Sequence, residues 1–282
     1  MDLKNVVLEG DPEKIASGFE FTEGPVWHKD GFLLFSDIPA NRIYRWSPEG
    51  VSIYHEPSGH SNGLALDADE NLLLCQHGAR AVARLSPSGS MDTLVDSYEQ
   101  KPLNSPNDLA VRSDGSIYFT DPPYGIQPDE IEQDCNGVYR LHTDGSVIRI
   151  KDDFIRPNGI AFNQDESILY VADSGRRHVR AISLTPQGLP AQDRIFADMD
   201  HTQPGSPDGI KVDQEGYVYV AGPTGLWIFS PAGVRLGVIV TPERPANCAW
   251  GDSDRKSLYI TARTSLYRIR THNPGLPDIR FQ

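Results

Sequence analysis

Six polar residues recur along the chain at intervals of 39 to 51 residues, and their side chains suit metal-dependent chemistry. Each begins a short phrase in which apolar residues alternate, as in Asn62-Gly63-Leu64-Ala65-Leu66. The six are Glu23, Asn62, Asn107, Asn158, Asp208 and Asn247. Two carboxylates and four amides offer oxygen donors only, the set that hard cations such as Ca²⁺ prefer. Mg²⁺ and Mn²⁺ suit the same donors, and Zn²⁺ is a less natural candidate because no His or Cys belongs to the set.

The repeat itself predicts the fold. A tight-turn cluster follows each phrase, and alternating segments come after it, as in Ile117-Tyr118-Phe119 and then residues 138–141 and 147–150. A period of about 40–50 residues built from four short strands is typical of β-propeller blades. We therefore expect an all-β, six-bladed β-propeller with four-stranded antiparallel blades, as a single domain over residues 1–282. Helix signals are weak, and only residues 96–101 and 129–133 could form a turn or two.

The two ends of the chain are expected to complete one blade together. The sixth unit ends after its third strand, and residues 13–17 precede Glu23 much as residues 93–97 precede Asn107. An N-terminal strand would then close the ring and cover edges that an open array leaves exposed. Because the innermost strand of each blade lines the central channel, the six polar residues would face one axis. Two bare carboxylates there would repel each other, and a bound cation removes that repulsion. Taken singly, each of the six could instead cap a turn.

Composition narrows the classes of partner. The chain has 282 residues, 38% of them apolar, and a net charge of −13. This acidity argues against nucleic acid and anionic membranes as partners. No apolar run approaches bilayer length and no export signal begins the chain, so we expect a cytoplasmic protein, a monomer or weak homo-oligomer. The three cysteines are expected to be reduced and buried: Cys75, Cys135 and Cys248.

Several phrases resemble the SMP-30/gluconolactonase family, whose members are six-bladed propellers that hydrolyse lactones with a divalent metal. The resemblance covers nearly the whole chain. The most specific phrases are Phe21-Thr22-Glu23-Gly24-Pro25-Val26-Trp27, Ser105-Pro106-Asn107-Asp108, Arg156-Pro157-Asn158-Gly159 and Ser206-Pro207-Asp208-Gly209. Bacterial gluconolactonase-like members are also similar to this chain around Ser61-Asn62-Gly63, Gln76-His77-Gly78 and residues 120–125.

The resemblance implies roles for individual residues. It makes Glu23, Asn158 and Asp208 the metal ligands, with Asp208 also the general base, and gives Asn107 a part in metal or substrate binding. Asn62 would also bind substrate. The implied reaction is hydrolysis of a sugar lactone such as gluconolactone to the aldonic acid, with Ca²⁺ as the expected ion.

Tyr124 and His77 are expected to line the mouth of the site and orient the substrate, although each could simply be packed or exposed. Animal members carry an Arg where this chain has Ser105, so their sugar preference does not transfer. Residues 121–136 could form part of a lid or a passive loop. Asp121 and Asp173 are interpreted mainly as hairpin caps.

Two other functions stay open at this stage. A phosphotriesterase or another ester hydrolase could use the same cation and carboxylates. A non-enzymatic binding scaffold is the other alternative, although the chain contains no Trp-Asp or Gly-Gly pair, the usual cues of WD40 and kelch repeats. A Ser nucleophile is disfavoured: residues 59–63 match G-x-S-x-G, but a strand-like alternation follows where that motif needs a helix.

Overall fold

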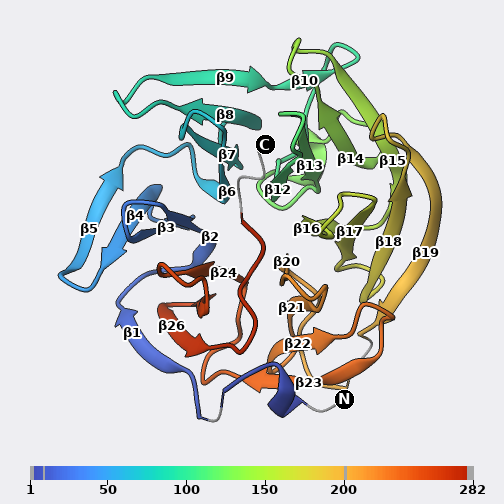
Figure 1. Ribbon diagram of the computed structural model, residues 1–282. Coiled ribbons are helices and arrows are strands. Elements are labelled where there is room, and N and C mark those ends of the chain that lie inside the picture. Colours follow the sequence, from blue (N-terminus) through green and yellow to red (C-terminus); the bar gives the residue numbers. More distant parts are fainter. Residues whose placement is uncertain (1–2, 9, 200–201, 278–282) are drawn as a thin grey trace.

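The computed structural model describes residues 3–8, 10–199 and 202–277, and these form six four-stranded antiparallel sheets arranged in a ring (Figure 1). The expected six-bladed β-propeller is therefore confirmed. Each sheet is one blade, its first strand lies next to the axis, and later strands lie progressively further out (Figure 1).

Blades 1 to 3 follow the chain in order. Blade 1 contains β2 (Thr22–His28), β3 (Phe32–Asp37), β4 (Arg42–Ser47) and β5 (Gly50–His55). Blade 2 contains β6 (Ser61–Leu66), β7 (Leu72–Gln76), β8 (Ala81–Leu85) and β9 (Met91–Val95). Blade 3 contains β12 (Leu109–Val111), β13 (Ile117–Asp121), β14 (Asn136–Leu141) and β15 (Val147–Phe154).

Blades 4 to 6 repeat the pattern. Blade 4 contains β16 (Pro157–Phe162), β17 (Ile168–Asp173), β18 (His178–Leu184) and β19 (Pro190–Asp198). Blade 5 contains β20 (Ile210–Val212), β21 (Val218–Gly222), β22 (Gly225–Phe229) and β23 (Arg235–Val240). Blade 6 contains β24 (Asn247–Gly251), β25 (Ser257–Ala262), β26 (Ser265–Arg270) and, as its outer strand, β1 (Glu13–Ser17).

The N-terminal strand closes the ring, as the sequence predicts. Strand β1 pairs antiparallel with β26, with Glu13 opposite Arg268 and Ser17 opposite Ser265. The first and last strands of the described chain therefore share one sheet, and β26 does not end as an unpaired edge.

One of the two helical expectations is wrong. Residues 96–101 form no helix but contribute to a small hairpin of β10 (Ser97–Tyr98) and β11 (Lys101–Pro102). Glu99 and Gln100 between them have φ of 50° and 65°, the left-handed pair that a tight two-residue hairpin turn requires. In the other segment, residues 128–130 form a single turn, η2 (Pro128–Glu130), and a further turn, η1 (Leu3–Asn5), lies near the N-terminus.

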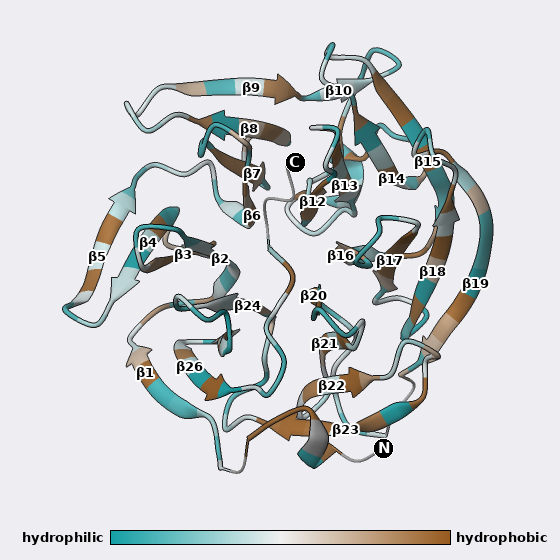
Figure 2. Ribbon diagram, viewed as in Figure 1, coloured by the Kyte–Doolittle hydropathy of each residue, from teal (hydrophilic) through white to brown (hydrophobic). Residues whose placement is uncertain are grey.

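Apolar side chains fill the space between blades. Tyr219, Leu226 and Tyr267 are fully buried, for example, in a cluster that joins blades 5 and 6. Figure 2 shows hydrophobic stretches along the strands and mostly hydrophilic turns. Among the described residues, no helix has the length and apolar character needed to cross a membrane.

The three cysteines are free, but one lies outside the core. Cys75 and Cys248 are buried as expected, whereas Cys135 is only half-buried. Cys135 belongs to the polar segment that connects β13 to β14, where its Sγ lies 3.3 Å from Nη1 of Arg149. The expectation of burial is therefore wrong for this residue, because a surface connection offers no apolar enclosure.

Adjacent blades are joined at the inner strands by side-chain hydroxyls. Ser36 of β3 donates to the carbonyl oxygen of Asn62 (2.8 Å), and Thr120 of β13 donates to that of Asn158 (2.9 Å). Gly24 has φ of 51°, and a Cβ on it would collide with the carbonyl oxygen of Asn62. Only glycine therefore lets blade 1 approach blade 2 this closely, and these contacts fix the starts of the inner strands relative to one another.

Carboxylates at the ends of second strands hold the loops that lead into the inner strands. Asp121 accepts from the backbone N–H groups of Asn104 and Ser105 at 2.8 and 2.7 Å. Asp173 accepts likewise from Ile155 and Arg156, both at 3.1 Å. Asp173 also accepts from the N–H groups of its own hairpin, so the expected capping role is confirmed for it. Asp121 caps the incoming loop instead.

Candidate active site

The starts of the inner strands surround a pocket of about 340 Å³ at one end of the channel, called the axial pocket below. Its size is adequate for a small ligand. Seven of its lining residues were predicted from the sequence: Glu23, Asn62, His77, Asn107, Tyr124, Asn158 and Asp208. The others are Phe21, Ile38, Arg156, Ser174, Ser206, Pro207 and Arg244. All seven predicted site residues therefore come together, although they span more than 180 positions of the chain.

Glu23 and Asp208 form an acidic pair in the floor of the pocket. Glu23 is only 4% exposed, and its Oε2 accepts from the N–H of Gly24 at 2.7 Å. Burial, reinforced by the negative charges of Asp208 and Asp108, holds the pKa of Glu23 well above its usual range. Burial also raises the pKa of Asp208 to about 7, against the opposing effect of Arg244. Without a cation, both groups therefore resist ionisation.

Asn158 is held in place by a polar neighbour from its own blade. Its Nδ2 donates to Oγ of Ser174 (3.2 Å), and that hydroxyl donates to the carbonyl oxygen of Pro207 (2.6 Å). Asn158 also lies within hydrogen-bonding reach of Asp208, an effect that lowers the pKa of the carboxyl group. Ser174 thus connects blade 4 to the loop that carries Asp208.

His77 and Asn62 form a polar pair on the neighbouring wall. The Nδ2 of Asn62 lies 3.3 Å from Nε2 of His77. Burial lowers the pKa of His77 to about 4, so the imidazole is neutral at pH 7 and its Nε2 can accept from the amide. Tyr124 is 39% exposed at the mouth, and partial burial raises the pKa of its hydroxyl.

Residues 121–136 contribute to the pocket through Tyr124. The N–H of Gly125 donates to Oγ of Ser105 at 3.0 Å. A Cβ on Gly125 would collide with Ser105 and with the side chain of His77. The beginning of this segment is therefore packed against blade 2 and against the loop that leads to Asn107.

The sixth residue of the repeat, Asn247, does not line the pocket. Its Nδ2 donates to Oδ2 of Asp108 at 3.4 Å, and it hydrogen-bonds with Glu23. Asp108 is itself buried, its Oδ1 accepts from the N–H of Leu109 (2.9 Å), and Lys211 lowers its pKa against the effect of burial. These groups form a second polar layer beside the pocket, so five of the six repeat residues line the pocket and Asn247 supports Glu23 from this layer.

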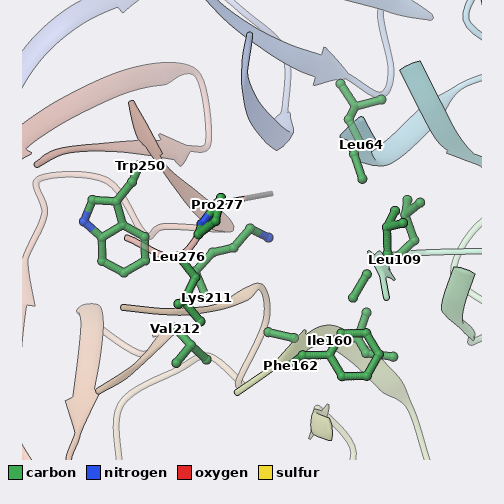
Figure 3. A pocket seen from close by; sticks show the side chains of 13 residues that line it. Leu64, Leu109, Ile160, Phe162, Lys211, Val212, Trp250, Leu276 and Pro277 are labelled. Atoms are coloured by element: carbon green, nitrogen blue, oxygen red, sulfur yellow. The ribbon is translucent and has the colours of Figure 1, made fainter. Parts of the chain in front are cut away.

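The opposite end of the channel is apolar. Leu64, Leu109, Ile160 and Phe162 line it, and the C-terminal residues Leu276 and Pro277 lie across it (Figure 3). Lys211 is the charged residue of this lining (Figure 3). Access for a polar ligand is therefore through the axial pocket.

The donor chemistry of the axial pocket fits a hard cation. Glu23, Asp208 and Asn158 present carboxylate and amide oxygens, and the two buried acids are held neutral by their surroundings until a positive charge compensates them. No cluster of three or more His, Cys, Asp or Glu suited to a metal ion occurs in the described part of the chain. A cation here would therefore be held by a mixed set of two acids and an amide, completed by further neutral oxygens such as water.

Four residues that orient or charge the site were not predicted as site residues, in addition to the wall residues Phe21, Ile38, Ser206 and Pro207. Asp108 follows Asn107 directly in the repeat phrase, which was a usable signal. Arg156 and Arg244 each stand before a proline just ahead of an inner strand, so the recurring Arg-Pro dipeptide was another. Ser174 had no signal, because its position follows from the pairing of β16 with β17.

A six-bladed propeller with acidic and amide side chains converging at one end of its axis defines the class of this protein. The family model described as "SMP-30/Gluconolactonase/LRE-like region" matches residues 21–264. The chain belongs to this family.

Individual relatives agree with that assignment. The gluconolactonase of Zymomonas mobilis is 38% identical, with 93% of this chain and 82% of that protein covered. The pentonolactonase XacC of Haloferax volcanii is 28% identical, with 85% and 80% covered. A solved structure from Xanthomonas campestris, described as a gluconolactonase, has a TM-score of 0.88 at 34% identity, with 95% and 92% covered.

Proposed function

We propose that this protein is a lactonase that hydrolyses a sugar lactone to its aldonic acid with the help of a bound divalent cation, Ca²⁺ in the first place. Lactone hydrolysis is supported by 38% identity to a gluconolactonase over 93% of the chain. The cation is supported by the convergence of Glu23, Asn158 and Asp208 on one pocket. That convergence is the observation that carries the proposal.

Glu23, Asn158 and Asp208 would hold the cation through their side-chain oxygens. When bound, a divalent cation polarises the lactone carbonyl and stabilises the negative charge that develops on its oxygen. Asn158 donates through Nδ2 to Ser174, so its amide oxygen is the atom available for this role. The other candidate ions, Mg²⁺, Mn²⁺ and Zn²⁺, are distinguished by experiment below.

Asp208 is the proposed general base. It retains some solvent exposure, unlike Glu23, so a water molecule can reach it from the pocket. In the metal-free protein its pKa is about 7, with Arg244 opposing the effect of burial. A bound cation would favour the ionised carboxylate, the form that accepts a proton from water. Glu23 is more enclosed and accepts from the Gly24 N–H, an arrangement suited to a fixed ligand.

The remaining residues would position the sugar ring. Asn62 and Asn107 offer amide groups to the hydroxyls of the lactone, and the neutral His77 keeps Asn62 oriented. Tyr124 contributes a ring face and a hydroxyl at the mouth. Phe21, Ile38 and Pro207 are the apolar part of the wall.

The test is a panel of aldonolactones assayed after chelation, with Ca²⁺, Mg²⁺, Mn²⁺ and Zn²⁺ added back one at a time. We expect chelation to abolish turnover and Ca²⁺ to restore it best. A phosphotriester run in parallel examines the other hydrolase function. Absence of activity with every pairing of lactone and ion would reject the proposal in favour of an esterase or a binding scaffold.

The role of Asp208 is tested by the Asp208→Asn variant. We expect a kcat lower by about 10²–10⁴-fold, the usual contribution of a general base. Because the variant also lacks one anionic ligand, Ca²⁺ should raise its melting temperature less than that of the unmodified protein. The control is Asp69→Asn, at an exposed turn on the opposite end of blade 2, with activity expected to equal that of the unmodified protein. An Asp208→Asn protein with full activity and normal metal affinity would refute the assignment.

A further inference from the structure

Three arginines surround the mouth of the axial pocket without a carboxylate partner within 4 Å among the described residues. Arg156 and Arg244 line the pocket, and Arg263 lies in the turn between β25 and β26. All three are exposed. Elsewhere in the chain, arginines such as Arg140 and Arg180 make ion pairs with aspartates. Arg45, Arg194 and Arg235 also lack such a partner among the described residues, and each stacks on an aromatic ring. What distinguishes the mouth is that three such cations gather around one pocket.

Arg244 and Arg263 lie near each other. Burial lowers the pKa of Arg244 most, and the positive charge of Arg263 lowers it further. The opposing effect of Asp208 is smaller. Asp208 interacts with both guanidinium groups, but with a pKa of about 7 it is only partly ionised, so their mutual repulsion is only partly offset. An anionic ligand bound between them would relieve this repulsion.

Glu243 holds the two arginines in this arrangement. Its Oε2 accepts from the N–H and the hydroxyl of Thr264, both at 2.9 Å, and its Oε1 accepts from the hydroxyl of Ser265 at 2.6 Å. The loop that carries Arg244 is thereby tied to the turn that carries Arg263. Both carboxylate oxygens of Glu243 accept these hydrogen bonds. Glu243 therefore does not form an ion pair with Arg244, although the two residues are adjacent in sequence.

Aromatic rings support two of the guanidinium groups. Arg156 lies 5.6 Å from the centroid of the Tyr124 ring, and Arg263 lies 5.4 Å from that of Phe21. Such stacking leaves the N–H groups in the plane of the guanidinium free to bind a carboxylate or phosphate. Both rings line the axial pocket, as do Arg156 and Arg244, so Arg263 lies directly beside the wall that Phe21 forms.

The charges of the site are separated by depth. The acids are at the floor, where Glu23 is 4% exposed, and the arginines are at the exposed rim. The carboxylate that hydrolysis creates forms at the floor, so the rim meets the part of the substrate remote from the lactone carbonyl. A neutral sugar lactone gives three rim cations nothing to pair with. A net charge of −13 also repels anions in general, so binding an anionic substrate requires local positive charge of this kind.

We propose that the substrate is a sugar lactone that carries an anionic group, carboxylate or phosphate, at the end remote from the ring carbonyl, and that Arg156, Arg244 and Arg263 bind this group. The inference rests on the proposed lactonase function and narrows its substrate class. The anion accepts hydrogen bonds from the guanidinium groups at the rim, while the lactone carbonyl reaches the floor beside Asp208.

The test uses two matched pairs of lactones. Glucaro-1,4-lactone carries a carboxylate where glucono-1,4-lactone has a hydroxymethyl group, and glucono-1,5-lactone is compared with its 6-phosphate. We expect kcat/KM for the anionic member of one pair to exceed that for its neutral partner by about tenfold or more, and the pair that shows it identifies the anion. Since the rim cations act through charge, added NaCl should reduce the preference.

Substitution at the rim assigns the preference to these residues. Arg244→Gln, Arg263→Gln and Arg156→Gln should each reduce the anionic-to-neutral ratio about tenfold, mainly through KM for the anionic lactone. The corresponding Lys variants should retain part of the ratio. The control is Arg235→Gln, which should leave the ratio unchanged. Arg235 is an exposed residue of β23, the outer strand of blade 5, and its guanidinium carbon lies 4.0 Å from the centroid of the Trp227 ring.

Two results would overturn the inference: an anionic-to-neutral ratio of one or less in both pairs, or a high ratio that all three Gln variants retain. Absence of hydrolysis in every pair would instead reject the lactonase function. In that case, the melting temperature is measured with and without glucarate, to test whether the three rim arginines bind an anion. A stabilisation that is lost in the Arg244→Gln/Arg263→Gln double variant supports the anion site, and no stabilisation of the unmodified protein rejects it.

Discussion

At the scale of single residues, Glu23 and Asp208 determine how the site responds to pH and to cations. Burial raises the pKa of both groups, to about 7 for Asp208, and each carboxylate makes the other harder to ionise. A carboxyl group whose pKa is higher in the folded than in the unfolded state favours folding at low pH, and this contribution is lost as the pH rises through the folded-state value. The metal-free protein should therefore lose stability between about pH 4 and pH 8 because of this pair.

The Glu23→Gln variant should change stability in opposite directions with and without metal. In EDTA, removing one buried charge next to Asp208 and Asp108 should stabilise the protein at pH 8 by roughly 1–3 kcal/mol. With Ca²⁺, the variant should lack the rise in melting temperature that binding gives the unmodified protein. Thermal unfolding at pH 5 and pH 8, with and without Ca²⁺, measures both effects, and Glu215→Gln in an exposed turn is the control. A variant that Ca²⁺ stabilises normally would show that Glu23 is not a ligand.

The sequence predicted the ring of site residues better than the groups that tune it. Glu23, Asn158 and Asp208 begin the first, fourth and fifth repeats, so the ring brings them to the same end of the channel whatever their side chains do. Asp108 was missed because, in a strand, consecutive side chains point to opposite faces, and Asp108 would then point away from Asn107. Both residues lie before β12, which begins at Leu109, so this alternation does not apply to them. Arg244 was missed because its effect on Asp208 comes through space, from a loop of another blade.

At the scale of elements, loops and strand ends decide how accurately the site is built. Asp121 and Asp173 cap the backbone ahead of two inner strands, and Glu243 performs a related task ahead of β24. The position of Asp173 at a strand end predicted its hairpin cap correctly. Local sequence does not show that Asp121, Asp173 and Glu243 also hold segments outside their own hairpins. The hairpin at Glu99 and Gln100 was missed for a similar reason: neither residue type signals a left-handed backbone.

The Glu243→Gln variant should test the loop anchor. Its carboxylate accepts from Thr264, Ser265 and Tyr267 and pairs with Lys14 at 3.1 Å, and these partners hold its pKa at about 2. A lowered folded-state pKa stabilises the fold above the ordinary value for Glu, and that contribution disappears as the pH falls from about 4.5 towards 2.

We therefore expect Glu243→Gln to lower the free energy of unfolding by about 1–2 kcal/mol at pH 7 and by much less near pH 2.5. Urea unfolding of both proteins at the two pH values measures the difference. Glu215→Gln serves again as the control, because its side chain is exposed. An equal loss at both pH values would mean that the ionised form of Glu243 does not contribute.

At the scale of the whole molecule, the repeat period was sufficient to predict the propeller and the strand that closes it. Six phrases at similar intervals leave few other architectures, and the missing strand of the last unit had one available source, residues 13–17. What the period cannot predict is where the second polar layer lies, because the position of Asn247 beside the pocket depends on its contacts with Asp108 and Glu23.

Closure by β1 makes the stability of the ring depend on residues that do not reach the site. Without β1, β26 would become an unpaired edge, and the half-buried Ile15 and Ala16 would leave the cluster around Phe35. A chain that lacks residues 1–17 should melt about 10 °C below one that lacks residues 1–12, which also loses the buried Val6 and Val7 but keeps β1. The shorter chain should also unfold in more than one step, because blade 6 can open before the others, and should aggregate through the exposed edge. Thermal and urea unfolding of the two truncated proteins measure the difference in stability and the number of steps. If both proteins unfold in one step at the same midpoint, pairing of β1 with β26 does not hold the ring closed.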